Sequence, residues 1–435
     1  MRAIKRLFIS VLLLVVLIAP LGAEESSFSK IRQEIEKEIK ENQIPSLAVA
    51  VIKDGKILWQ EGFGWANREQ KVRATEETMY SLASISKPIT ATGLMKLVQQ
   101  NKVALDQPIN KYLGEAKVQS PLGDVDKATV RRLANHSSGL PLHYQFFYAD
   151  TPHRAPARDE SIRRYGKLVT LPGESYRYAN FGYGILDYVI ERSSGHDYAT
   201  FMKEEVFSPL GMKHTAVVLS PVQQKLAATR YGTDQQPLAD YHFDHPGASA
   251  VYSSAHDLIR FASLHLKKPL ADQKRVLSDK SIDEMQRPTV TTKPGVGYGV
   301  GWRITENEYG FKTVTHTGGM PGVRTRLTLV PAEGIAVAAL SNTSSNLPHR
   351  VVEQILATLL PKYAQQMRRA SYQRTTAAPP LPWQPTADWI GYWTGVVETY
   401  TGKQPVKLWI QPDGDIHVQL NQQLKQLLNQ VRITD

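Results

Sequence analysis

Strand-like segments lie near both ends of the first 364 residues, and a long stretch of helical and loop patterns separates them. At the early end, apolar runs at 47–52 and 56–59 flank Asp54 and Gly55, a pair that predicts a hairpin because both positions accept positive φ. At the late end, alternating polarity and a glycine-bearing turn predict an antiparallel meander, with strands at 298–302, 313–317, 324–330 and 335–341. Pairing between the two ends would close one sheet around the inserted segment.

Helical periodicity accompanies these strands. Isoleucines recur every four residues from Ile31 to Ile39 and form one apolar stripe. Further helices are predicted at 84–100 and 347–364, and residues 105–290 combine short helical patterns with many Pro and Gly residues. We therefore expect an α+β fold, in which the two chain ends form an antiparallel β-sheet that is flanked by helices and interrupted by a mainly helical region.

A proline-rich segment divides the chain after the last of these helices. We expect one domain over 28–364, a linker over 371–386 and a C-terminal β segment over 387–435. An isolated hairpin is marginal in water, so this segment either docks on the first domain or begins a small β domain.

The first residues predict the compartment. Basic residues among the first six precede an apolar run at 7–19 and the small residues Gly22 and Ala23. This is the layout of a secretory signal peptide, predicted at 1–23. The apolar run is shorter than the roughly 20 residues of a membrane-spanning helix, so cleavage is favoured over an uncleaved anchor, and no stable membrane span is then expected. Either outcome predicts a periplasmic or secreted catalytic domain.

Composition excludes several classes of site. The chain has no cysteine, which excludes disulfides, thiolate metal sites and a cysteine nucleophile. The net charge of +11 arises from Lys and Arg interleaved with acids, without the basic and aromatic clusters that nucleic-acid binding requires. His242 and His245 are spaced like a metal-binding pair, but no third ligand is near them in sequence, so a surface loop is favoured. We expect no metal and no organic cofactor.

The first candidate catalytic element is Ser84-Ile85-Ser86-Lys87, which opens the helix predicted at 84–100. The spacing places Ser84 and Lys87 on one helix face, where an amine with a lowered pKa can accept the hydroxyl proton. The helix N-terminus adds N–H groups and partial positive charge where an oxyanion would form. A second S-x-x-K copy begins at Ser27, so the motif alone is weak evidence.

Two more elements follow in chain order, Tyr178-Ala179-Asn180 and His316-Thr317-Gly318-Gly319. With the S-x-x-K element they give a succession of motifs that resembles the class C β-lactamase and penicillin-binding-protein superfamily of serine hydrolases. Stretches at 135–141, 209–212 and 252–257 resemble the same family, and the resemblance covers about residues 28–362.

This resemblance implies an acyl-enzyme mechanism. It makes Ser84 the nucleophile, with Lys87 and Tyr178 as the groups that move its proton. It assigns substrate binding to Asn180, His316, Thr317 and Gly318, and an oxyanion hole to the backbone N–H groups of Ser84 and Gly319.

His316 departs from the β-lactamase pattern, because those enzymes carry a lysine there. A side chain near half-charge at neutral pH replaces a permanent cation, which weakens the case for β-lactam hydrolysis. The His-Thr-Gly triplet resembles that of D-aminopeptidases, D,D-peptidases and esterases. Arg324 and Arg326 are candidates for the missing cation.

We therefore expect an exported serine hydrolase that cleaves amide or ester bonds in small molecules or peptides. D-amino-acid peptides, cell-wall peptides among them, are the leading substrates. An esterase or a weak β-lactamase of the same fold is the alternative within the enzyme class. A non-catalytic penicillin-binding sensor or scaffold is the alternative of another class.

Overall fold

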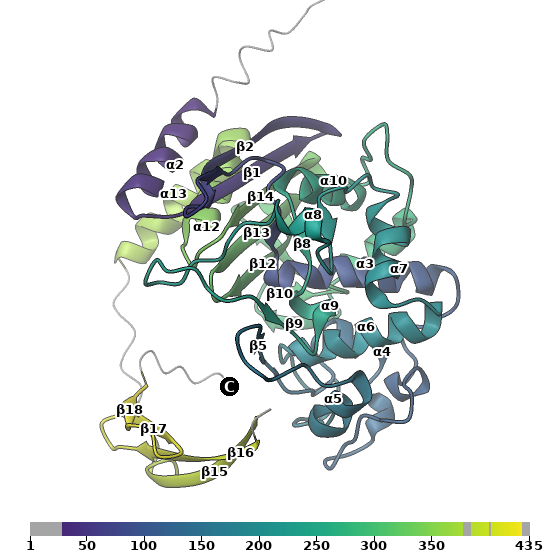
Figure 1. Cartoon of the computed structure of the whole chain (residues 1–435), viewed down its shortest axis with the longest axis vertical. Coiled ribbons are helices and arrows are strands. Elements are labelled where there is room, and N and C mark those ends of the chain that lie inside the picture. Colours follow the sequence, from purple (N-terminus) through teal and green to yellow (C-terminus); the bar gives the residue numbers. More distant parts are fainter. Residues whose placement is uncertain (1–27, 377–383, 400–401, 429–435) are drawn as a thin grey trace, which may run out of the picture. The chain divides into compact units, whose positions relative to one another are not determined.

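The computed structural model describes residues 28–376, 384–399 and 402–428 (Figure 1). The predicted signal peptide and residues 377–383 of the predicted linker lie outside these ranges. Within the described ranges, every helix is too short or too polar to span a bilayer. The chain divides into two compact units at Met367 and Arg368.

A nine-stranded sheet lies at the centre of the first unit, in the order β3-β2-β1-β14-β13-β12-β11-β10-β9. Its strands are β1 Ser46–Lys53, β2 Lys56–Asn67, β3 Val72–Arg73, β9 Val290–Lys293, β10 Val296–Tyr298, β11 Arg303–Glu308, β12 Phe311–Met320, β13 Val323–Val330 and β14 Ile335–Ser341. Strand β1 pairs antiparallel with β14, with Leu47 opposite Ser341. The early hairpin and the late meander therefore form one antiparallel sheet, which confirms the predicted fold class.

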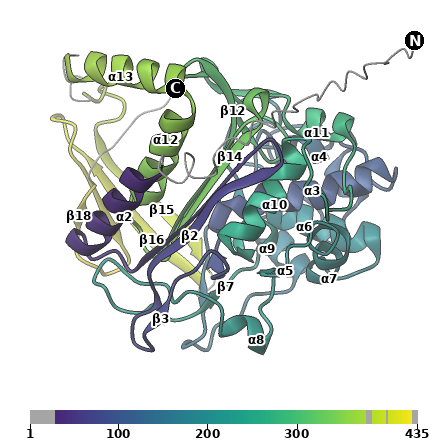
Figure 2. The same cartoon turned by 90° about the horizontal axis from the view of Figure 1, so that it is seen from above.

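Helices cover both faces of this sheet (Figure 2). On one side lie α2 (Ser29–Glu41) and α12 (Leu347–Leu359), and on the other lie α3 (Ser86–Gln99) and α10 (Ala255–His265). Strand β1 shows the consequence, because Val49 packs in the core beneath α2 and α12 while Ala50 packs in the core on the opposite face. A strand buried on both faces has a continuous apolar sequence instead of an alternating one.

The inserted region is mainly helical, as predicted. Its helices are α4 Val130–Ala134, α5 Arg158–Tyr165, α6 Asn180–Ser194, α7 Tyr198–Met202, α8 Pro221–Gln224, α9 Pro246–Ser249 and α11 Asp279–Met285. Short ladders tie its loops together: β4 Tyr80–Ser81 and β6 Thr215–Ala216 pair with β8 Tyr252–Ser253, and β5 Phe147–Tyr148 pairs with β7 Tyr241–His242.

The end of the first unit differs from the prediction. The single helix expected at 347–364 is two helices, α12 and α13 (Pro361–Thr376), because the extended Leu360 separates them. A residue before proline is disfavoured in the α conformation, whereas proline is tolerated in the first helical turn. Residues 371–376 of the predicted linker therefore belong to a helix.

The second unit is a four-stranded antiparallel sheet in the order β15-β16-β17-β18. Its strands are β15 Gly391–Thr399, β16 Gly402–Ile410, β17 Ile416–Leu420 and β18 Gln426–Leu427. Trp389, Tyr392 and Trp393 are exposed, whereas Ile410 is buried. A sheet this small buries few apolar side chains of its own.

Candidate active site

Ser84 lies at the junction of a short strand and a buried helix. A 3-10 turn at Ala83–Ile85 follows β4 and continues directly into α3. Ala83 holds a positive φ of 48°, a strained conformation for a residue with a Cβ, and Ser84 is partly exposed. Such strain next to a nucleophile fixes the direction of its side chain.

Strand β12 packs against this turn through a glycine. A Cβ added to Gly318 would lie 2.1 Å from the Leu82 carbonyl oxygen and 3.1 Å from the Ala83 Cβ. The Thr325 hydroxyl of β13 donates a hydrogen bond of 2.9 Å to the same Leu82 oxygen. Gly318 therefore allows the sheet to approach the nucleophile turn closely, a contact that no larger residue permits.

Lys87 is completely buried one helical turn after Ser84. Its Nζ lies 3.0 Å from the Ser84 Oγ, 2.8 Å from the Asn180 Oδ1 and 3.0 Å from the Ala248 carbonyl oxygen. Burial lowers the pKa of Lys87 well below 10.5. A neutral amine donates two hydrogen bonds, which the two carbonyl oxygens accept, and its lone pair is then free to accept the Ser84 proton.

Tyr178 lies on the other side of the nucleophile. Its hydroxyl is hydrogen-bonded to the Ser84 side chain, and the Lys87 Nζ lies 4.7 Å from the centre of its ring. Burial raises the pKa of Tyr178 above that of a free phenol, and its interaction with the Ser84 side chain offsets only part of that rise. Tyr178 is therefore a neutral phenol in the resting site, able to donate a proton.

His136 supports the Tyr178 segment, a role that the sequence did not reveal. The imidazole is fully buried with its ring centre 4.2 Å from that of Tyr178, and its Nδ1 accepts a hydrogen bond of 3.1 Å from the Ala179 N–H. Burial lowers the pKa of His136 well below its ordinary value, so the ring is neutral. His136 has a positive φ of 64°, and it acts as a positioning residue for Tyr178.

Asn180 begins α6 and faces inward. Its Oδ1 accepts from Lys87, and its Nδ2 donates a hydrogen bond of 3.1 Å to the His143 carbonyl oxygen. Both ends of the amide are thus engaged within the protein, where the sequence predicted a substrate contact. In this state Asn180 orients Lys87.

The end of β12 presents an edge that pairs with no strand on one side within the described ranges, although the Tyr144 hydroxyl donates a hydrogen bond of 3.2 Å to the Gly319 carbonyl oxygen there. Strand β13 pairs with β12 as far as Met320, whereas the pairing with β11 stops at Thr315. Beyond that point Thr317 and Gly319 are exposed and Gly318 is buried. Unpaired N–H and C=O groups on a strand edge can bind an extended substrate backbone.

His316 is buried and neutral, so the expectation of a half-charged side chain is wrong. Its Nε2 lies 2.7 Å from the Tyr298 hydroxyl, and its Nδ1 lies 2.8 Å from the Thr317 carbonyl oxygen. The carbonyl fixes the proton on Nδ1, so Nε2 accepts from Tyr298. Burial, together with the nearby Lys87, lowers the pKa of His316 to about 3.

The two downstream arginines have different environments. Arg326 is buried and forms ion pairs of 3.3 Å with Glu308 and 3.1 Å with Glu353, which removes it from the site. Arg324 forms no ion pair within the described parts of the chain, and its Nη1 would lie 2.9 Å from a Cβ added to Gly319. Arg324 lies opposite Gly319 in the ladder, on the face of the sheet away from Gly318 and the nucleophile turn, so its guanidinium borders Gly319 and not the catalytic side chains.

Comparison with known proteins agrees with this geometry. A family model described as Beta-lactamase matches residues 31–362, and the chain belongs to that family. Combined with the Ser84, Lys87 and Tyr178 cluster, membership makes the protein a serine hydrolase.

Two curated proteins are similar to this chain at low sequence identity. The chain is 24% identical over 326 residues to Protein flp of Staphylococcus aureus (strain MW2), covering 74% of this chain and 64% of that protein. It is 28% identical over 345 residues to Unguisins hydrolase ungD' of Aspergillus campestris (strain IBT 28561), covering 74% and 63%. The chain thus spans less than two thirds of the length of these relatives.

Solved structures share the fold at low identity. An octameric penicillin-binding protein homologue from Pyrococcus abyssi superposes with a TM-score of 0.68 at 24% identity, covering 92% of this chain and 89% of the other. A class C beta-lactamase gives 0.66 at 19% identity, covering 78% and 97%. EstCE1, described as a hydrolase with promiscuous acyltransferase activity, gives 0.66 at 21%, covering 77% and 99%.

Proposed function

We propose that this serine hydrolase is exported and cleaves amide or ester bonds through an acyl-Ser84 intermediate, with D-amino-acid peptides as its principal substrates. The observation that carries the proposal is the hydrogen bonding of Lys87. Its Nζ lies within 3.0 Å of two carbonyl oxygens and of the Ser84 Oγ, so in the neutral amine the two N–H groups bind the carbonyl oxygens and the lone pair is left for the Ser84 proton. An amine held this way is a general base at neutral pH.

Acylation begins when the Ser84 oxygen bonds to the substrate carbonyl carbon and its proton moves to Lys87. Backbone N–H groups of Ser84 and Gly319 stabilise the oxyanion, and each such donor contributes on the order of 3 kcal/mol in other hydrolases. The bond to the leaving group then breaks. Tyr178 donates its proton to the leaving atom and regains one from Lys87.

Deacylation reverses these proton movements. Water attacks the Ser84 ester and passes a proton through Tyr178 towards Lys87, and the serine oxygen recovers a proton as the acid leaves. A neutral Tyr178 suits this relay, since it gives and takes a proton without carrying a lasting charge.

Two features favour peptides and esters over β-lactams. The neutral His316 supplies no cation at the third motif, and the strand edge at the end of β12 suits an extended backbone. We extend the proposal to Arg324, whose guanidinium borders the exposed Gly319 and would bind a substrate carboxylate that extends past this strand edge, such as a peptide C-terminus. The raised pKa of Tyr178 supports an esterase as the second candidate, because a weaker acid protonates an amine leaving group less readily and ester cleavage needs less of this protonation.

A substrate panel separates the candidates. Nitrocefin, a short-chain nitrophenyl ester and a D-Ala-D-Ala peptide would be compared on the wild-type chain and on Ser84→Ala. The proposal expects the highest kcat/KM for the peptide and no turnover by the variant. A higher kcat/KM for the ester would establish the esterase, and stoichiometric labelling by a fluorescent penicillin without turnover would establish a sensor.

The proposal also includes export of the protein and cell-wall peptides as substrates. The basic and apolar layout of residues 1–23 supports export, and an envelope location would place cell-wall peptides within reach. Expression with and without residues 1–23, followed by cell fractionation, tests this part. Equal distribution of the two forms between cytoplasm and envelope would refute export.

A further inference from the structure

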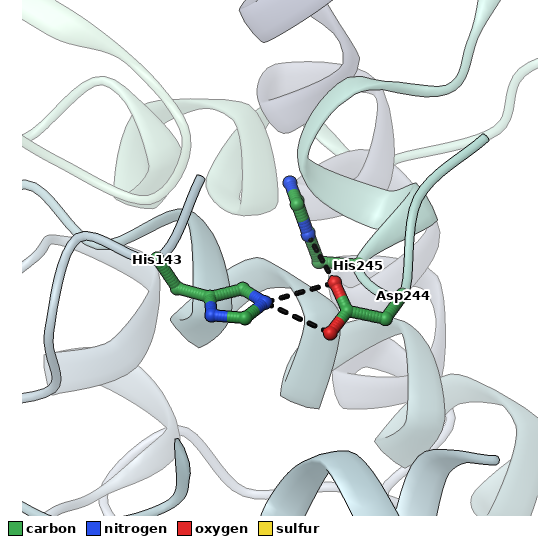
Figure 3. A group of neighbouring side chains, drawn as sticks. All are labelled: His143, Asp244 and His245. Atoms are coloured by element: carbon green, nitrogen blue, oxygen red, sulfur yellow. Dashed lines mark hydrogen bonds and ion pairs between the residues drawn. The ribbon is translucent and has the colours of Figure 1, made fainter. Parts of the chain in front are cut away.

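The side chains of His143, Asp244 and His245 form a buried cluster (Figure 3). The His143 Nε2 lies 2.9 Å from both carboxylate oxygens of Asp244, and the His245 Nδ1 lies 2.7 Å from the Asp244 Oδ1. The side chain of His143 is 4% exposed, and those of Asp244 and His245 are 0% exposed. Three potential ligand atoms therefore converge at a point away from bulk water.

The local backbone builds this convergence. Strand β5 pairs with β7, with Phe147 opposite His242, so the chain before β5 runs beside the chain after β7. That register brings His143 to Asp244 across 101 residues of sequence. Gly184 of α6 makes room, since a Cβ there would lie 2.6 Å from the His245 Cβ.

The negative charge of the buried Asp244 carboxylate requires a positive partner. Among the described residues, the Asp244 carboxylate forms ion pairs only with His143 and His245. The nearby Arg158 donates a hydrogen bond to the Asp244 backbone oxygen, but its ion pairs are with Asp187 and Glu191. A buried carboxylate without Lys or Arg is neutralised by a protonated histidine or by a metal ion.

We propose that His143, Asp244 and His245 form a binding site for a divalent ion of the zinc type. Two imidazole nitrogens and one carboxylate oxygen are a donor set that zinc accepts, with water in the fourth position. Ligands about 2.0–2.1 Å from a tetrahedral ion lie about 3.3 Å apart, so the donors need to separate by roughly half an ångström.

The site is distinct from the acyl-transfer chemistry. It shares no side chain with Ser84, Lys87 or Tyr178, although the His143 carbonyl oxygen binds Asn180. The ion would hold together the two loops that flank the lysine, and no reaction step passes through it. The proposal therefore stands or falls independently of the substrate.

Zinc binding to the full chain provides the test. The chelator-washed protein would be dialysed against Zn²⁺, bound metal counted by elemental analysis, and thermal unfolding followed with and without Zn²⁺. We expect one ion per chain and a rise in Tm, because a ligand that binds only the folded state stabilises it. Co²⁺ should give the visible absorption of a low-coordinate site with nitrogen and oxygen ligands.

Two variants and a control locate the ion. Asp244→Asn keeps the shape of the side chain, and His143→Asn suits the positive φ of 49° at that position. Each should weaken zinc binding by roughly 100-fold or more and abolish the Tm rise. His242→Ala, two residues from Asp244 but exposed, should leave both unchanged.

Other results would overturn the proposal. Absence of stoichiometric zinc from the wild-type chain would leave a hydrogen-bonded histidine-carboxylate cluster only. Binding that survives His143→Asn but is lost in His242→Ala would identify an adventitious surface site. If Asp244→Asn does not fold, His143→Asn and the wild-type stoichiometry still decide between these outcomes.

Discussion

At the level of single residues, the burial of Lys87 destabilises the folded protein but gives the enzyme a base for Ser84. The side chain is fully buried and its pKa is lowered well below 10.5, so between that lowered pKa and 10.5 the folded protein holds a neutral amine where the unfolded chain binds a proton. The same desolvation that disfavours the charged form makes the lone pair available to Ser84. Stability and activity at this position are therefore opposed.

This opposition predicts a pH dependence of stability. Between the lowered pKa of Lys87 and 10.5, the unfolded chain binds one more proton than the folded chain, so wild-type stability should rise with pH. Relative to Lys87→Met, which lacks the group, the free energy of unfolding should rise by up to about 1.4 kcal/mol per pH unit. Denaturant unfolding of both proteins at several pH values measures it, and parallel curves would show that Lys87 is not buried as a neutral amine.

Arg324 should discriminate among substrates by charge. Arg324→Ala should raise KM for a peptide with a free C-terminal carboxylate by roughly fivefold, since a partly exposed ion pair contributes about 1 kcal/mol. The KM of an uncharged nitrophenyl ester should change little. Equal loss for both substrates would mean that Arg324 supports the structure of β12 instead of binding a carboxylate.

At the level of elements, the contact between β12 and the nucleophile turn depends on Gly318. Gly318→Ala would force a Cβ to within 2.1 Å of the Leu82 oxygen, so the strand and the turn must separate. We expect a loss of about 1–3 kcal/mol of stability, together with a large loss of acylation rate. Gly182→Ala in α6, where the nearest atom is at 3.4 Å, is the control and should retain both.

Thermal unfolding measures the stability of Gly318→Ala, and single-turnover experiments measure its acylation rate. A variant as active as wild type would contradict the assigned packing. A variant that unfolds but regains activity at low temperature would show that stability alone had been affected.

Most elements that carry the site were predictable from the sequence, for reasons that particular residues show. Asp54 and Gly55 form the predicted hairpin turn between β1 and β2, and the helix after Ser84 follows the predicted apolar pattern. The order of the three motifs indicated which residues meet. The structure brings the three side chains together, with the Lys87 Nζ 3.0 Å from the Ser84 Oγ and 4.7 Å from the centre of the Tyr178 ring.

Other features depend on tertiary contacts that sequence patterns do not encode. His316 is neutral because it is buried beside Tyr298, which is 18 residues away in sequence. The sequence offered no third ligand for Asp244 and His245, because His143 reaches them only through the β5–β7 ladder. The prediction of a surface loop is confirmed for His242, which is exposed, but it is wrong for Asp244 and His245, which are buried.

At the level of the whole molecule, every residue of the proposed mechanism belongs to the first unit. A chain ending at Thr376 should therefore keep its fold and a kcat/KM within about twofold of the full chain on a small ester. Deletion of 377–435 followed by kinetics and thermal unfolding tests this. A loss of more than tenfold with an unchanged Tm would assign the second unit a part in catalysis or substrate binding.

The proton transfer from Ser84 to Lys87 has one direct chemical consequence, a covalent acyl group on Ser84. Rapid mixing with a nitrophenyl ester, followed by intact-mass measurement and peptide mapping, should reveal one acyl group on the peptide that contains Ser84. The label should be absent from Ser84→Ala and retained in Ser27→Ala, which removes the other S-x-x-K serine. An acyl group on a different residue, or undiminished hydrolysis by Ser84→Ala, would contradict the assignment of the nucleophile.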